Sequence, residues 1–265
     1  MKDLSSLFSS DPRSQNILAG LVTVVYVKVV VGLCDYAVSH GILAPRISRK
    51  CIHIAAGAWI IWWPFFHPDH WTWRLNVLVP AVYTIQLFVK GFIIQNPNDT
   101  DVQTMTRTGN PKELLNGPIL FTVIMTLVGL LQFRQKMGVV IMTCLGFGDG
   151  IAPLMGYYCP FGSYPTWPFG ANDRKTLSGS MGFVVASVAG YFLTKFVIAQ
   201  DEGTMAKQHD DDDKEWEMIL QIATVAAITE GLCGQFDNPT IALSALLTYQ
   251  LLDNTKPTSI HPIGV

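Results

Sequence analysis

The sequence has few charged residues for its length. Asp, Glu, Lys and Arg make up 14% of the 265 residues, against roughly 25% in an average soluble protein. Hydrophobic residues make up 49%, and the mean hydropathy is +0.32. The charges cluster between apolar runs instead of recurring at every helical turn, as they would in the amphipathic helices of a soluble protein. We therefore expect an integral membrane protein.

The chain also lacks the features of several other classes. The net charge is −2, so no basic field indicates a nucleic-acid partner. The five cysteines have no spacing typical of a zinc site or a disulfide framework. The first sixteen residues resemble neither a signal peptide nor a transit peptide, so we expect the first helix to act as the targeting signal. The sequence contains no internal repeat, which a transporter built from inverted halves would show.

Long apolar runs are what the sequence has in abundance. A spanning helix needs roughly 20 mostly apolar residues. We identify eight runs near that length, of which the second, fourth and eighth are short: 17–38, 51–66, 75–95, 117–133, 138–158, 178–199, 216–234 and 239–252. The prediction is an all-α, polytopic bundle of seven to eight transmembrane helices. It spans residues 17–252, after a polar N-terminal segment (1–16) and before a C-terminal tail (253–265).

Most of the polar chemistry lies in three loops, at residues 39–50, 96–116 and 157–177. In an eight-helix arrangement they lie on one face with the turn at residues 237–238. The loop at 39–50 leads into a helix on which Arg46, Arg49, Lys50 and His53 follow one face. A basic cluster at that place can hold phosphate groups. The alternative is basic residues that snorkel to the membrane surface beside a packed histidine. The loop at 96–116 adds further charged residues.

Asp149 stands between Gly148 and Gly150 inside the fifth apolar run. Charges within membrane helices are costly and tend to be functional. Glycines let a ligand or a backbone approach closely, and a carboxylate suits Mg²⁺, which prefers oxygen ligands. This pattern indicates a metal or catalytic site. The alternative is a glycine-rich helix crossing that holds an incidental aspartate.

Residues 173–180 precede the sixth run and combine two cations, Arg174 and Lys175, with three hydroxyl groups and an exposed helix start. Such a segment offers a phosphate environment, although it is not a P-loop. Glu230 and Asp237 lie near the end of the seventh run and add oxygen ligands. The pair after them, 238–239, is also typical of an ordinary turn.

Basic residues, acids and glycines are therefore expected to gather at helix ends on one face of a membrane protein. Phosphoryl transfer depends mainly on positioning and charge neutralisation. The constellation fits a reaction between a nucleotide phosphate and a lipid that enters from the bilayer.

At this point the motifs become recognisable, because five segments in order over roughly residues 46–250 resemble the polyprenol kinase family. This family includes phytol kinases, farnesol kinases and the more distant dolichol kinases. The matching segments are SRKCIH at 48–53, GNPKELLNGP at 109–118, FGDGIA at 147–152, RKT with the glycine and serine at 174–180, and a glutamate followed by DNPT at 230–240.

The resemblance implies a kinase that uses a nucleoside triphosphate, with CTP as the expected donor and Mg²⁺ as cofactor, to phosphorylate an isoprenoid alcohol. It implies catalytic roles for three residues: Asp149, Lys175 and His53. It places the nucleotide at eight: Arg49, Lys50, Lys112, Gly148, Gly150, Arg174, Gly179 and Ser180. It assigns the metal to Asp149, Glu230 and Asp237, and places Glu113 and Asn238 elsewhere in the pocket. The expected location is a membrane, which in a eukaryote would be the endoplasmic reticulum or a plastid membrane.

One departure and several alternatives remain open. Members of the family commonly have an acid where this chain has Pro153, which removes one possible metal ligand. The alternatives are a diacylglycerol kinase, a cytidylyltransferase that makes CDP-lipids, a transporter and a non-catalytic relative. The sequence does not decide which prenol is the substrate.

Overall fold

The computed structural model describes residues 11–166, 174–202, 212–233 and 237–254. In this part of the chain nearly all of the structure is helical. The exception is a two-stranded antiparallel hairpin of β1 (Ser163–Pro165) and β2 (Arg174–Thr176). The predicted all-α class is confirmed, whereas the hairpin was not predicted.

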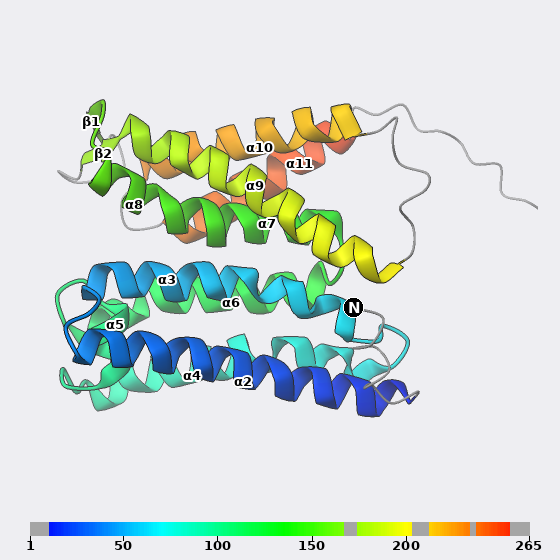
Figure 1. Ribbon diagram of the computed structural model, residues 1–265, viewed down its shortest axis with the longest axis horizontal. Coiled ribbons are helices and arrows are strands. Elements are labelled where there is room, and N and C mark those ends of the chain that lie inside the picture. Colours follow the sequence, from blue (N-terminus) through cyan, green and yellow to red (C-terminus); the bar gives the residue numbers. More distant parts are fainter. Residues whose placement is uncertain (1–10, 167–173, 203–211, 234–236, 255–265) are drawn as a thin grey trace, which may run out of the picture.

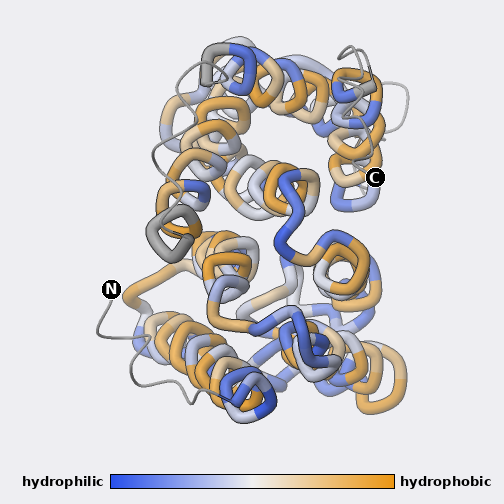
Figure 2. The backbone as a smooth tube through the Cα atoms, turned by 90° about the vertical axis from the view of Figure 1, so that its right-hand side faces the viewer, coloured by the Kyte–Doolittle hydropathy of each residue, from blue (hydrophilic) through white to orange (hydrophobic). Residues whose placement is uncertain are grey.

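The helices form two layers, with α2 to α6 in one and α7 to α11 in the other (Figure 1). The first layer contains α2 (Pro12–Ser39), α3 (Pro45–Gly57), η1 (Ala58–Phe65), η2 (Trp71–Val77), α4 (Leu78–Phe88), η3 (Val89–Ile94), α5 (Thr100–Met105), η4 (Pro111–Leu115) and α6 (Gly117–Leu131). The second contains α7 (Lys136–Thr143), η5 (Cys144–Gly148), α8 (Asp149–Tyr158), α9 (Leu177–Glu202), α10 (Asp212–Leu232) and α11 (Asp237–Asn254). Figure 2 shows the two layers from one end of the bundle.

The first helix begins at Pro12, earlier than the predicted start at residue 17. Asp11 is its N-cap, and the Asp11 carboxylate accepts a hydrogen bond from the backbone N–H of Ser14 at 3.1 Å. Proline is favoured at the first helical position because the missing N–H would have no partner there. The last residues of the predicted polar segment 1–16 therefore belong to α2.

Five helical stretches among the described residues are long and apolar enough to cross a membrane: Pro12–Ser39, Trp71–Ile94, Pro111–Leu131, Lys136–Tyr158 and Leu177–Ile198. The other three predicted spans are also helical, as α3 with η1, α10 and α11. The total of seven to eight spanning helices stays a prediction.

The charged loops gather at one end of the bundle. Figure 1 shows the α2–α3 connection, α5 and the β-hairpin at this end, as the order of the loops predicted. Lys175 of β2 also contacts Asp237 at the start of α11. We call this the loop end.

The two layers meet at two glycines. A Cβ atom on Gly57 of α3 would collide with the backbone of Gly146 in η5, and the reverse also holds. Small residues of this kind let membrane helices approach closely. The π-helical turn of η5 ends where α8 begins, at Asp149. This close approach brings His53 and Lys50, one and two turns before Gly57 on α3, next to Asp149.

Candidate active site

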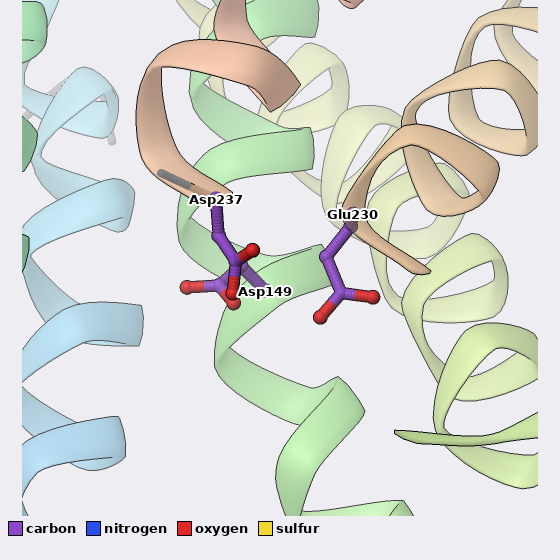
Figure 3. Close-up of side chains that lie close together, drawn as sticks. All are labelled: Asp149, Glu230 and Asp237. Carbon is purple, nitrogen blue, oxygen red and sulfur yellow. The ribbon is translucent and has the colours of Figure 1, made fainter. Parts of the chain in front are cut away.

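Three carboxylates converge between the layers at the loop end. Asp149 is the first residue of α8, Glu230 lies near the end of α10, and Asp237 begins α11. One carboxylate oxygen from each of them lies within 4.8 Å of the other two (Figure 3). The side chains are 7%, 6% and 18% exposed. Buried like charges at this distance repel one another and need cations nearby.

Two residues of α3 hold Asp149. Lys50 Nζ lies 3.0 Å from Asp149 Oδ2, and His53 Nε2 lies 2.9 Å from the same oxygen. His53 Nε2 is also 2.8 Å from the carbonyl oxygen of Leu145. Both oxygens near Nε2 are acceptors, so this nitrogen carries the hydrogen. In a neutral ring Nδ1 is then the acceptor, and it has no hydrogen-bond partner among the described residues.

Pro153 explains the second contact of Lys50. In an α-helix the carbonyl of Asp149 accepts a hydrogen bond from the N–H of the residue four positions later. That residue is Pro153, which has no N–H. Lys50 Nζ donates to this free carbonyl at 2.8 Å. The Pro153 side chain is exposed. The three carboxylates therefore lie together even though this chain has no acid at position 153.

Lys175 and Arg174 are neighbours on β2 but have different surroundings. Lys175 Nζ lies 2.5 Å from Glu230 Oε1 and 3.3 Å from Asp237 Oδ2, and it also donates to the Glu230 carbonyl. Arg174 is exposed, and its Nε donates to Ser163 Oγ at 2.9 Å. Successive side chains on a strand point to opposite faces. Of these two residues, Lys175 therefore contacts the carboxylates and Arg174 does not.

A cavity of about 370 Å³ opens beside this cluster, within the first layer. Its charged and polar lining consists of Arg49, Lys50, His53, Arg107, Glu113, Asn116, Thr122, Asp149, Asp237 and Asn238. The rest of its lining is apolar apart from the phenol of Tyr83: Val27, Val31, Ile52, Ala56, Trp59, Val79, Pro80, Tyr83, Leu87, Met105, Gly117, Pro118, Phe121 and Met125. Most of the polar residues lie at the loop end, and the apolar ones extend along α2, α3, α4 and α6.

The cavity adds one residue to the predicted set. Arg107 and Arg49 both line it, and neither forms an ion pair with a described side chain. Glu113 accepts hydrogen bonds from the Arg107 backbone N–H at 2.5 Å and from the Thr108 hydroxyl. The sequence shows Arg107 in a charged loop but outside the matching segments. The segment at 109–118 points to Lys112 instead.

Plant kinases are similar to this chain over much of its length. The chain is 31% identical over 153 residues to probable phytol kinase 1, chloroplastic, of Glycine max, which covers 57% of this chain and 49% of that protein. It is 26% identical over 217 residues to phytol kinase 1, chloroplastic, of Arabidopsis thaliana (80% and 68%). It is also 26% identical over 223 residues to farnesol kinase, chloroplastic, of that species (80% and 67%). The chain is therefore similar to proteins named phytol kinase and farnesol kinase.

This chain spans about half to two thirds of the length of those kinases. No family model and no solved structure matches it. The residues that carry the resemblance to the polyprenol kinases all lie within the described part of the chain. Their arrangement in the structure therefore shows what each motif does for the fold.

The glycines of the polyprenol kinase motifs serve helix packing. A Cβ atom on Gly148 would collide with Ser187 of α9, and one on Gly150 would collide with Ile54 of α3. Gly179 at the start of α9 faces the backbone of α8 in the same way. These contacts account for the three glycines without a ligand, so their expected place in nucleotide binding stays a prediction.

Three further predicted residues lie around the cluster and do not join it. The Ser180 hydroxyl lies 2.6 Å from the Tyr164 hydroxyl, which ties α9 to the hairpin. Lys112 is exposed and does not line the cavity. Asn238 lines the cavity, and its Nδ2 donates to the Gly117 carbonyl at 2.8 Å, which ties α11 to α6. The structure thus brings together two groups: Lys50 and His53 around Asp149, and Lys175 with Glu230 and Asp237.

Proposed function

We propose that this chain is a membrane-embedded kinase that transfers the γ-phosphoryl group of CTP to an isoprenoid alcohol. In this reaction R–OH and CTP give R–O–phosphate, CDP and a proton. One observation carries the proposal: the buried cluster of carboxylates and lysines adjoins the polar end of an otherwise apolar cavity. The homology to proteins named phytol kinase and farnesol kinase supports the same activity.

The exposed surface of α2 supports the membrane location. Leu21, Val25, Val29 and Leu33 recur every four residues and are 59%, 61%, 53% and 64% exposed. A continuous apolar stripe of this kind is rare on a soluble monomer and suits contact with lipid. The polar Thr23 of the same helix is buried instead. The relatives are described as chloroplastic, which favours a plastid membrane over the endoplasmic reticulum.

The three carboxylates fit a magnesium ion. They offer oxygen ligands only, within 4.8 Å of one another, which is the chemistry that Mg²⁺ prefers. Asp149, Glu230 and Asp237 would hold the ion, and Lys50 and Lys175 balance the carboxylates when it is absent. When bound, it would neutralise charge on the transferring phosphoryl group.

The guanidinium groups of Arg49 and Arg107 are proposed to bind the phosphates of the donor. They line the cavity at the loop end, where a soluble nucleotide can approach. Guanidinium groups without a carboxylate partner suit bidentate binding of phosphate oxygens. The preference for CTP over other nucleoside triphosphates rests on the resemblance to the polyprenol kinases.

His53 is proposed to accept the proton of the alcohol. Its Nε2–H is directed at Asp149 and Leu145, which leaves the lone pair of Nδ1 as the base, and His53 lines the cavity. Asp149 thereby orients the ring, as a carboxylate does when it fixes the tautomer of a histidine base. The alcohol oxygen can then attack the γ-phosphorus while its proton moves to Nδ1.

A transfer assay on the purified full chain in nanodiscs tests this function. It uses γ-labelled CTP, ATP or UTP with a panel of prenols and diacylglycerol, with and without magnesium. We expect label in a prenyl phosphate, most of all with CTP and only with magnesium. Label in phosphatidate would instead identify a diacylglycerol kinase. Transfer from α-labelled CTP would identify a cytidylyltransferase, and no transfer to any lipid would overturn the proposal.

A further inference from the structure

We propose that the apolar part of the cavity is the binding site of the isoprenoid chain, and that Trp59 and Met125 form a floor that limits its length. The inference rests on the proposed kinase function and goes further, because it states which alcohols fit. It concerns the side of Asp149 that faces α2, α3, α4 and α6, away from Lys175.

The cavity is open at one end and closed at the other. At the loop end its lining includes the exposed residues Arg107 and Asn116. At the other end Trp59, Val79 and Met125 are 0%, 8% and 4% exposed. An amphiphile can therefore fit in one direction only, with its apolar tail toward Trp59 and its hydroxyl group beside His53 and Asp149.

The floor is held rigidly. Trp59 Nε1 donates to the Asn76 carbonyl at 3.0 Å, and the indole packs edge-to-face on Trp63 with ring centroids 5.5 Å apart. Its far edge lies against Gly129 of α6, where a Cβ atom would collide with it. Asn76 also donates to the Gly129 carbonyl at 3.3 Å. Because Trp59 is held on several sides, the cavity cannot deepen past the indole by a simple rotamer change of Trp59.

The dimensions favour a single chain. From Arg49 at the open end to Trp59 at the floor, the helix advances about 15 Å at its usual rise per residue. The volume of about 370 Å³ is near the lower end of the usual range for ligand pockets, roughly 300–1,000 Å³. One slender, branched hydrocarbon chain suits this space, whereas the two long chains of diacylglycerol do not.

Two substitutions should shorten the site without disturbing the charged cluster. Val79→Phe and Met125→Phe each place a ring near the floor. Leu127→Phe is the matched control, because Leu127 lies on the same helix as Met125 but is 50% exposed. The thermal midpoint of each variant, measured without substrate, shows whether it is folded.

The first readout is kcat/KM for geraniol, farnesol, geranylgeraniol and phytol, together with the KM for the nucleotide. We expect both cavity variants to shift the preference toward shorter prenols by roughly tenfold or more, the usual scale for steric exclusion from an apolar pocket. The nucleotide KM and the control should not change. Folded, active cavity variants with the chain-length preference of the wild type would overturn the inference.

The second readout does not depend on turnover. A farnesol analogue with a diazirine at its tail end is irradiated with the full-length wild type and with Asp149→Asn, and the labelled peptides are identified. We expect labelling in η1 and α6 that excess farnesol suppresses and Met125→Phe reduces. Labelling elsewhere, beside normal prenol phosphorylation, would overturn the cavity assignment alone. Labelling at the floor without phosphorylation of any prenol would overturn the proposed function alone.

Discussion

The two layers of the bundle differ in how they are packed. In the second layer the stretch Lys136–Tyr158 is mostly buried, with 72% of its apolar window inside the protein, against 28% for each of the three candidate spans in the first layer. The second layer is filled by small buried residues such as Ala223, Ala226 and Ala245, which let helices pack closely. The first layer instead encloses the cavity. We call the second layer (α7 to α11) the solid layer, because it holds the carboxylates in place. We call the first layer (α2 to α6) the hollow layer, because it leaves room for a ligand.

The two layers depend on each other at one place. Lys50 and His53 belong to the hollow layer, and both contact Asp149, which belongs to the solid layer. Gly57 and Gly146 set how closely the layers approach there. Substitutions in one layer, or at the junction of Gly57 and Gly146, therefore test whether one layer holds the carboxylates and the other binds the ligand.

Asp149→Asn should have the largest effect. It removes the charge shared by Lys50 and His53 with little change in volume, and we expect kcat to fall by about a thousandfold, as when a main electrostatic group of an active site is lost. Asp101→Asn is the matched control, because Asp101 is also buried and pairs with a lysine, Lys90, but does not line the cavity. Normal turnover by a folded Asp149→Asn protein would contradict the assignment.

Magnesium should stabilise the wild type through the solid layer. At a concentration of about 100 times its Kd, a bound ion adds roughly 2.7 kcal/mol to the free energy of unfolding, which a thermal melt detects as a rise in Tm. Glu230→Gln and Asp237→Asn should lose this rise, whereas Glu217→Gln, at an exposed site on α10, should keep it. An equal rise in all four proteins would mean that the ion binds elsewhere or nonspecifically.

His53→Gln tests the contribution of the hollow layer to the chemistry. The glutamine can still donate a hydrogen bond to Asp149, but it lacks the basic nitrogen that corresponds to Nδ1. We expect kcat to fall by roughly a hundredfold, within the usual range for a general base, while the KM for the nucleotide changes little. If His53 only positions Asp149, the glutamine variant should retain most of its kcat and His53→Ala should lose it.

Gly57→Ala should have the smallest effect and should act on the junction. The added methyl group collides with the Gly146 backbone, and overpacking of this kind costs about 1–3 kcal/mol of stability. Because the layers must separate slightly, activity should fall as well. Gly32→Ala on α2 is the control, since nothing lies within 4 Å of its added Cβ atom. Equal stability of the two variants, measured by denaturant unfolding, would show that the junction tolerates separation.

The sequence predicted the helices and the polar residues of the site with little help from tertiary structure. All eight apolar runs are helical, because length and hydrophobicity are local properties. Asp149, Glu230 and Asp237 are expected together as metal ligands from the resemblance to the polyprenol kinases, and the structure places them close together. Their role as metal ligands stays a prediction. The predicted convergence of the loops also follows from simple alternation of helices.

Only the tertiary structure decided which of these residues meet. Arg174 and Lys175 are adjacent cations that were both expected at the site, but a short strand, which was not predicted, turns them to opposite sides. Pro153 looks like a lost ligand, yet its missing N–H frees the carbonyl that Lys50 binds. Arg107, the packing of the glycines and the closed floor at Trp59 depend on which helices become neighbours. Local sequence determines helix formation and burial tendency, whereas contacts between residues far apart in the chain arise only when the helices pack.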